Sequence, residues 1–377
     1  MLEPYLDDLE SRLDDEVEDR LYAEWADFTA GRFVGDIFSP RRATAGPPRV
    51  EWPRVVVNEA IADFDRMALQ QFAAASRALA EGTGALLNVR SNYGTSILPS
   101  LFGVALFRQD NEQDTLPTSW PLCPDGNLDP IRRLVDAGVP DLDALDETTL
   151  AGRTLLMADR FEAILGRYPK IGRHVHHYHP DLQGPMDVCE VLVGSHLFLA
   201  LVDEPALIHA FLDLLTETYI RYLRRWKKRG HSSFARDETV FLDQNQGFSS
   251  HKKDECPLFS AHWGMMHEGV IMLRDDSAMN LSPAMFEEFV KPYDQRLLDA
   301  FGGGAIHFCG RGDHYIDSMC AMPGMHAIAM SQPDYNDMEV IYGATVDRGI
   351  NLIGLNRTAA ESALAAGRDL HGRVHCW

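Results

Sequence analysis

The stretch GGGAIHFCGRGDHYIDSMCAMPGMHAIAM spans residues Gly302–Met330 and is the most informative part of the chain. It predicts an apolar strand that ends in a polar turn carrying His307 and Cys309, followed by a short helix. Residues i and i+2 of an extended segment point to the same side, so the imidazole of His307 and the thiolate of Cys309 can reach one ion. Histidine nitrogen and cysteine sulfur are zinc ligands, and a catalytic zinc site has three protein ligands and one open position.

The third ligand has to come from another part of the chain. Cys376 is the best candidate, because it ends a further short predicted strand, GRVHC, at residues 372–376. Cys320 is the alternative, although it falls on the helix predicted after the first strand. The H-x-C spacing taken alone is equally compatible with a buried cysteine beside a histidine and no metal.

Four segments carry a resemblance to a known family: Pro180–Gly194 (PDLQGPMDVCEVLVG), Asp203–Glu217 (DEPALIHAFLDLLTE), Leu281–Tyr293 (LSPAMFEEFVKPY) and His307–Gly310 (HFCG). They resemble the uroporphyrinogen decarboxylase superfamily, which includes the zinc-dependent, corrinoid-linked methyltransferases. The resemblance extends over about residues 173–377. It implies an α/β fold, a (β/α)8 barrel of the TIM type with an N-terminal helical extension. It also implies that His307, Cys309 and Cys376 hold the zinc ion.

The order of predicted elements agrees with such a fold. Strand and helix patterns alternate from about residue 170 to the end, which predicts a parallel sheet, whether closed into a barrel or open and doubly wound. We expect residues 1–57 to form an N-terminal helix and connector, and residues 58–377 to form the barrel domain. A strand is predicted at 239–245, and a long loop that covers the site at 247–269. Apolar residues recur at helical spacing near the N-terminus: Leu6, Leu9, Leu13, Val17, Leu21, Trp25 and Phe28.

This N-terminal pattern predicts one amphipathic helix, packed on the body of the protein or on the second subunit of a homodimer.

Asn58 is the predicted N-cap of a later helix that ends at Gly82. A basic run, RRWKKRG, closes the long helix predicted over 203–229. Positive charge there complements the helix dipole.

Composition limits the class of protein. The 377 residues include 35 basic and 56 acidic side chains, a net charge of −21, which disfavours a nucleic-acid partner. No run of apolar residues is long enough for a membrane span, and the acidic N-terminus lacks the features of a secretory signal. The six cysteines are too scattered for a disulfide framework. We therefore expect a cytoplasmic protein.

Barrel enzymes carry their chemistry at the carboxyl ends of the strands, and several polar residues follow predicted strands here. Asp181, Asp275 and Asp276 are the candidate catalytic carboxylates. The candidate substrate-binding residues are Arg90, Asn92, Tyr93, His179 and Gln183.

The resemblance and these residues together predict a zinc-dependent methyltransferase. It would move a methyl group between a small methylated substrate or thiol and a corrinoid (cobalamin) carrier. The chain has no D-x-H-x-x-G corrinoid-binding motif, so the corrinoid would arrive in trans, free or on a corrinoid protein. The methyl donor and acceptor, the direction of transfer and the fourth metal ligand stay open. The alternatives are a metal-independent decarboxylase of the uroporphyrinogen decarboxylase type and a non-catalytic barrel subunit.

Overall fold

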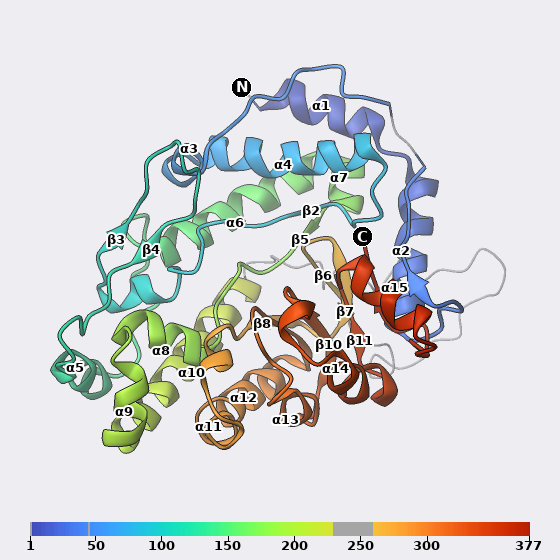
Figure 1. Cartoon of the computed structure of the whole chain (residues 1–377). Helices are drawn as coiled ribbons and strands as arrows, with labels where there is room; N and C mark the ends of the chain where they lie inside the picture. The colour runs from blue at the N-terminus through green and yellow to red at the C-terminus, as the bar shows by residue number, and fades with distance from the viewer. Residues whose placement is uncertain (1, 44–45, 229–258) are drawn as a thin grey trace, which may run out of the picture.

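A six-stranded parallel sheet forms the centre of the protein (Figure 1). The computed structural model describes residues 2–43, 46–228 and 259–377, so the strand predicted at 239–245 lies outside the described residues. The strand order is β1-β12-β11-β10-β9-β8. The bounds are β1 Ile37–Phe38, β8 Ile271–Arg274, β9 Gly304–Phe308, β10 Met325–Met330, β11 Asn351–Leu352 and β12 Val374–His375.

Side chains alternate strictly between the two faces of this sheet. On β9, Ala305 belongs to a small apolar cluster on one face, and Ile306 and Phe308 belong to the large core on the other. The small cluster also contains Met272, Ala327 and Ala329 from the neighbouring strands, Ile353 directly after β11, and Trp25 and Phe28. We call the face that carries this small cluster the inner face. The opposite face, which packs on the large core and its helices, is the outer face.

The other described strands form three pairs. They are β2 (Asn88–Val89) parallel to β5 (His176–His177), β3 (Leu106–Phe107) antiparallel to β4 (Thr118–Ser119), and β6 (Phe259–His262) antiparallel to β7 (Met265–Glu268). The described residues thus give a mixed α/β fold with a parallel sheet, and a closed eight-stranded barrel is not seen among them.

The N-terminal prediction was right about burial and wrong about continuity. Leu6, Leu9 and Trp25 are buried as expected, but the segment forms two helices, α1 (Glu3–Arg12) and α2 (Asp15–Thr29). The break has a local cause: the Asp14 side chain accepts hydrogen bonds from the backbone of Glu16 and Val17 and so caps a new helix. The apolar stripe is covered within the same chain.

The connector after these helices is part of the sheet. Its residues Ile37 and Phe38 form β1, which pairs in parallel with β12, so the boundary drawn at residue 57 does not separate the sheet from the N-terminal segment. The next predicted helix is also divided, into α3 (Val57–Ala62) and α4 (Phe64–Glu81). Asp63 caps α4 in place of Asn58, and Gly82 ends it at φ +65° as predicted.

Some of the remaining helices lie against the sheet and others lie away from it: those of residues 283–320 are just below β8 and β10, whereas those of residues 129–137 and 185–203 are at the left of the view (Figure 1). Ser282 caps α11 by accepting a hydrogen bond from the backbone of Met285, with Pro283 at the first helical position, as the sequence predicted. The helices are α5 Asp129–Ala137, α6 Leu150–Arg167, α7 Pro169–His174, α8 Pro185–Val193, α9 Leu197–Asp203, α10 Pro205–Lys228, α11 Pro283–Phe289, α12 Lys291–Phe301, α13 Ile316–Cys320, α14 Met338–Ala344 and α15 Arg357–Ala365. Short 3₁₀ turns lie at Pro99–Phe102, Ser277–Asn280, Pro333–Tyr335 and Val346–Arg348.

Within the described residues, no single helix has the length and apolar character of a membrane span. Taken together, α8 and α9 reach that level, but they are bent by 104° at the break between them.

Candidate metal centre

Three side chains of different chemistry meet at the carboxyl ends of β8 and β9. The possible ligand atoms of Asp276, His307 and Cys309 all lie within 4.8 Å of one another, and each residue is half-buried. The Cys309 sulfur is 3.4 Å from Nε2 of His307. The backbone N–H of Cys309 donates a 2.7 Å hydrogen bond to Oδ1 of Asp276, which ties the two strand ends together.

Strand alternation explains this convergence. His307 is two residues after Ala305, so its side chain lies on the inner face like that of Ala305. Cys309 is two residues further on, and its side chain points to the same side. On β8, Met272 and Arg274 share that face, and Arg274 is paired with His307 in the sheet register. Asp276 is two residues after Arg274, just beyond the end of β8, and its carboxylate lies on the same side as His307 and Cys309. The structure therefore brings His307 and Cys309 together as predicted, with Asp276 as the third member.

Cys376 is not a member of this group, which corrects the predicted ligand set. Its neighbour His375 contacts the aromatic rings of Trp25 and Phe38 on the inner face. Cys376 is therefore on the outer face, where its buried thiol belongs to the large core. Burial raises the pKa of this thiol to about 11, an effect that the charge of Arg357 opposes and that of Glu361 reinforces. Cys320 is likewise buried in the large core, on α13.

The protonation of the three-residue group follows from its surroundings. Burial lowers the pKa of His307, an effect that Asp276 opposes and Arg274 reinforces. The imidazole is therefore neutral at pH 7, which is the form that binds metals. Burial raises the pKa of the Cys309 thiol, and a hydrogen bond to Ser331 opposes this. A bound divalent cation would favour the thiolate instead.

Asp181 lies beside this group but is already held by other side chains. Arg90 and Arg274 both form ion pairs with its carboxylate, and Nε1 of Trp263 donates a 3.1 Å hydrogen bond to it. Burial would raise the pKa of Asp181, but Arg274 and Arg90 lower it below its ordinary value. Asp181 is thus an anionic anchor for two arginines.

Trp263 connects the anchor to the candidate metal group. It lies at the tip of the β6–β7 hairpin with φ +52°. Its ring meets the His307 ring edge-on at a centroid distance of 5.0 Å, and the Arg274 guanidinium lies 4.5 Å from its centroid. Part of the loop predicted over 247–269 therefore forms a hairpin that reaches the site, and the part up to residue 258 lies outside the described residues.

Asp275, a predicted catalytic residue, is on the opposite side of β8 from Asp276. Its carboxyl is buried next to Asp294 of α12, and burial and this neighbour raise its pKa well above the ordinary value. Burial also raises the pKa of Asp294 to about 8. The protonated forms of these two carboxyls are therefore favoured, and both lie under the sheet, away from the candidate metal group.

Among the predicted substrate-binding residues, Arg90 and Gln183 lie near the site, whereas Tyr93 and His179 have structural positions. Arg90 binds Asp181, and Gln183 lines a cavity of about 420 Å³ that also reaches Asp276. Asn92 is half-buried in the loop after β2. Tyr93 is buried in the large core, and burial raises its pKa to about 12. His179 is also structural, because its Nδ1 donates to the Pro180 carbonyl while its Nε2 accepts from the backbone N–H of Met272.

Four residues of the site were absent from the sequence prediction: Asp187, Trp263, Arg274 and Ser331. Asp187 accepts hydrogen bonds from the backbone N–H groups of Asp276 and Ser277, at 3.0 and 2.8 Å, and so holds the turn that carries Asp276. Arg274 was detectable in the sequence, since it precedes two aspartates at the end of an apolar strand. The other three are recognisable only from the folded arrangement.

The chain resembles a methyltransferase in fold. A methyltransferase from Methanosarcina mazei matches it with a TM-score of 0.60 and 17% sequence identity, over 94% of this chain and 92% of that one. No protein-family model matches the chain, and no curated protein sequence does. At this identity the match establishes the fold alone, and the chemistry has to be inferred from the residues of this chain.

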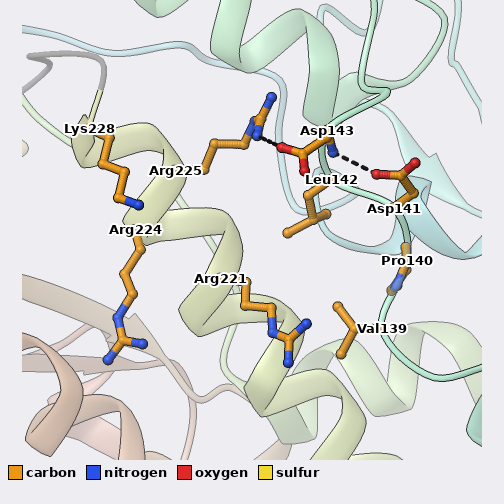
Figure 2. A pocket seen from close by; sticks show the side chains of 9 residues that line it. All are labelled: Val139, Pro140, Asp141, Leu142, Asp143, Arg221, Arg224, Arg225 and Lys228. Atoms are coloured by element: carbon orange, nitrogen blue, oxygen red, sulfur yellow. Dashed lines mark hydrogen bonds and ion pairs between the residues drawn. The ribbon is translucent and has the colours of Figure 1, made fainter.

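A second cavity, of about 470 Å³, lies at the carboxyl end of α10, where the basic run was predicted. Four cationic side chains from α10 line it, Arg221, Arg224, Arg225 and Lys228. In Figure 2, Arg221 and Arg225 extend toward the loop 139–143, whereas Arg224 and Lys228 lie on the side of the helix away from that loop. Arg225 forms an ion pair with Asp143 across the cavity. None of the three candidate metal ligands lines this cavity.

Proposed function

We propose that this protein is a zinc-dependent methyltransferase that moves a methyl group between a small methylated substrate or thiol and a corrinoid carrier supplied in trans. The observation that carries the proposal is the convergence of Asp276, His307 and Cys309. Its architecture would be a (β/α)8 barrel with an N-terminal helical extension. The fold match to a methyltransferase supports methyl transfer in general terms.

The donor set fits zinc in chemistry, charge and spacing. Zinc accepts imidazole nitrogen, thiolate sulfur and carboxylate oxygen, and bonds of about 2.0 to 2.3 Å in a tetrahedral site separate its ligands by roughly 3.3 to 3.8 Å. The observed 3.4 Å between the Cys309 sulfur and the His307 nitrogen is in that range. A neutral imidazole, one thiolate and one carboxylate carry a total charge of −2, which balances the ion. Three protein ligands leave one position for substrate.

The neighbouring residues have supporting roles in this proposal. Zinc bound there would supply Lewis-acid and thiol-binding chemistry. Ser331 hydrogen-bonds the Cys309 sulfur, and Asp187 orients the turn bearing Asp276. Trp263 packs against His307 and limits its rotation. Arg90 and Arg274 form ion pairs with Asp181, which accepts the hydrogen bond from Trp263. These ion pairs hold Asp181 in place.

A decarboxylase remains the second candidate because two arginines, Arg90 and Arg274, lie beside the site. Arginines of this kind bind carboxylate substrates. Here, however, both are already paired with Asp181, so a substrate carboxylate would have to displace an internal one. The arrangement therefore favours the metal-dependent reaction over both decarboxylation and a non-catalytic role.

The test combines metal analysis with a methyl-transfer assay. The purified protein should retain about one zinc per chain after dialysis, measured by elemental mass spectrometry. It should also demethylate methylcobalamin in the presence of a small thiol, followed by visible absorbance. Removing the metal with a chelator should abolish the reaction, and added zinc should restore it. Undiminished activity in metal-free protein would refute the zinc mechanism, and absence of both zinc and activity would favour a non-catalytic role.

A further inference from the structure

The cavity beside Asp276 is lined by acidic side chains and by no basic side chain of the described residues. It measures about 420 Å³, within the usual range for a small-molecule site. Three carboxylates line it, Asp187, Glu190 and Asp276, whereas no lysine, arginine or histidine does so among the described residues. Burial and the neighbouring Asp275 raise the pKa of Asp187 well above its ordinary value, and a bound zinc ion would balance the charge of Asp276. The negative charge that remains available in the cavity is therefore that of Glu190.

Gln183 gives this cavity a free polar group. The residue is 8% exposed, and its side-chain amide has no hydrogen-bond partner within the described part of the chain. The two amide atoms are not among the described buried atoms that lack a partner, so they are open to the cavity. Because Gln183 lines the cavity, its donor and acceptor are available to a ligand there.

Glu190 supplies an available negative charge. The oxygens of Asp187 are engaged by the backbone of Asp276 and Ser277, and Asp276 belongs to the candidate metal group. Glu190, half-buried on α8, makes no ion pair or side-chain hydrogen bond with the residues that the structure describes. It is therefore the carboxylate that a ligand can use without disturbing the metal group.

We propose that this cavity binds the methylated substrate and that this substrate is a small organic cation, with its methyl group on a positively charged nitrogen or sulfur. Glu190 is the counter-charge, and Gln183 binds the polar part of the molecule. The inference rests on the proposed function for its location, since Asp276 joins the cavity to the metal group. A carboxylate or phosphate substrate would be repelled by the same lining.

The basic cavity at the end of α10 provides an internal contrast. Four cations and two aspartates line it, and Arg225 is paired with Asp143, so the lining keeps an excess of positive charge that would attract an anion (Figure 2). An anionic probe that binds this protein is therefore expected there and not beside Asp276. The charge of a probe therefore selects between two cavities on one chain.

The experiment is isothermal titration calorimetry with three probes of similar size: tetramethylammonium, tert-butanol and pivalate. The wild-type protein should bind the cation more tightly than the other two. Glu190→Gln should weaken cation binding by about fivefold or more, because the ion pair is lost, and leave the zinc content unchanged. The control Glu147→Gln removes the same charge at an exposed position and should leave cation binding unchanged.

The outcomes separate the two proposals. Equal cation affinity in the wild type and Glu190→Gln, or tighter binding of pivalate that Arg224→Ala leaves unchanged, would overturn the substrate class even if zinc and methyl transfer are present. Loss of cation binding in Glu190→Gln alone would support it even if zinc is absent, since calorimetry does not depend on the metal.

Discussion

The ends of β9 and β12 look alike in sequence and differ in structure. Both carry a histidine and a cysteine, as His307-Phe-Cys309 and His375-Cys376. The intervening residue in the first pair puts both side chains on the inner face, where they meet Asp276. The adjacent pair on β12 is divided, with His375 among aromatic rings and Cys376 in the large core. The single residue between His307 and Cys309 therefore accounts for the difference: that pair joins a candidate metal centre, whereas the adjacent pair His375-Cys376 becomes two core residues on opposite faces.

The largest effect expected from this comparison concerns zinc. Cys309→Ala should reduce bound zinc from about one per chain to nearly none and abolish methyl transfer, because it removes a ligand from a half-buried group. Elemental analysis and the methylcobalamin assay measure the two effects. Circular dichroism should show that the fold is retained.

Cys376→Ala is the matched control, because it removes a thiol of the same kind from the other strand end. It should keep its zinc. A folded Cys376→Ala protein without zinc would show that the ion is bound differently, with Cys376 among its ligands.

Asp276→Asn gives the next largest effect. The amide oxygen can still accept the Cys309 N–H that Asp276 accepts at 2.7 Å, so the turn keeps its shape while the ligand charge is lost. Zinc affinity should fall by at least about tenfold, measured by competition with a chromophoric chelator. Asp334→Asn, at an exposed carboxylate beyond β10, should not alter it. Equal affinity in the wild type and Asp276→Asn would remove Asp276 from the ligand set.

The sequence predicted those features that depend on local spacing. The cap at Ser282, the end of α4 at Gly82 and the shared face of His307 and Cys309 all follow from residues close together in the chain. The opposite sides of Cys376 and His375 were also readable from their adjacency. The sequence did not show which of the two residues lies on the inner face. His375 lies there because it contacts Trp25 and Phe38, which come from the distant N-terminal segment.

The role of Asp276 depends on packing between strands. Asp275 and Asp276 are adjacent and polar, so the sequence offered both as catalytic groups. Only the register that sets Arg274 beside His307 places Asp276 near Cys309 and leaves Asp275 under the sheet with Asp294. The helix breaks at Asp14 and Asp63 were missed for a different reason, since local capping there outweighed a continuous helical pattern.

The two cysteines should also differ in their contribution to stability. Cys376 is 0% exposed within the large core, so Cys376→Ser places an unpaired hydroxyl among apolar groups. The free energy of unfolding should fall by about 1 to 3 kcal/mol. Cys309→Ser, at a half-buried site next to Ser331, should change it much less in metal-free protein. Urea denaturation of both variants without zinc measures the difference, and equal losses would contradict the assignment of Cys376 to the core.

The smallest expected effect is the contribution of His375 to the pH dependence of the free energy of unfolding. Burial lowers the pKa of His375 to about 3, and Arg357 adds to this. Between that value and the ordinary pKa of about 6.5, the unfolded chain holds a proton that the folded chain excludes, so His375 makes the protein less stable as the pH falls. In His375→Asn, the side-chain oxygen can replace Nδ1 as the acceptor for the N–H of Gly354. Between pH 7.5 and pH 6, metal-free His375→Asn should lose about 0.8 kcal/mol less stability than the wild type. Urea denaturation at both pH values measures this, and parallel losses in the two proteins would mean that His375 is accessible to protons in the fold.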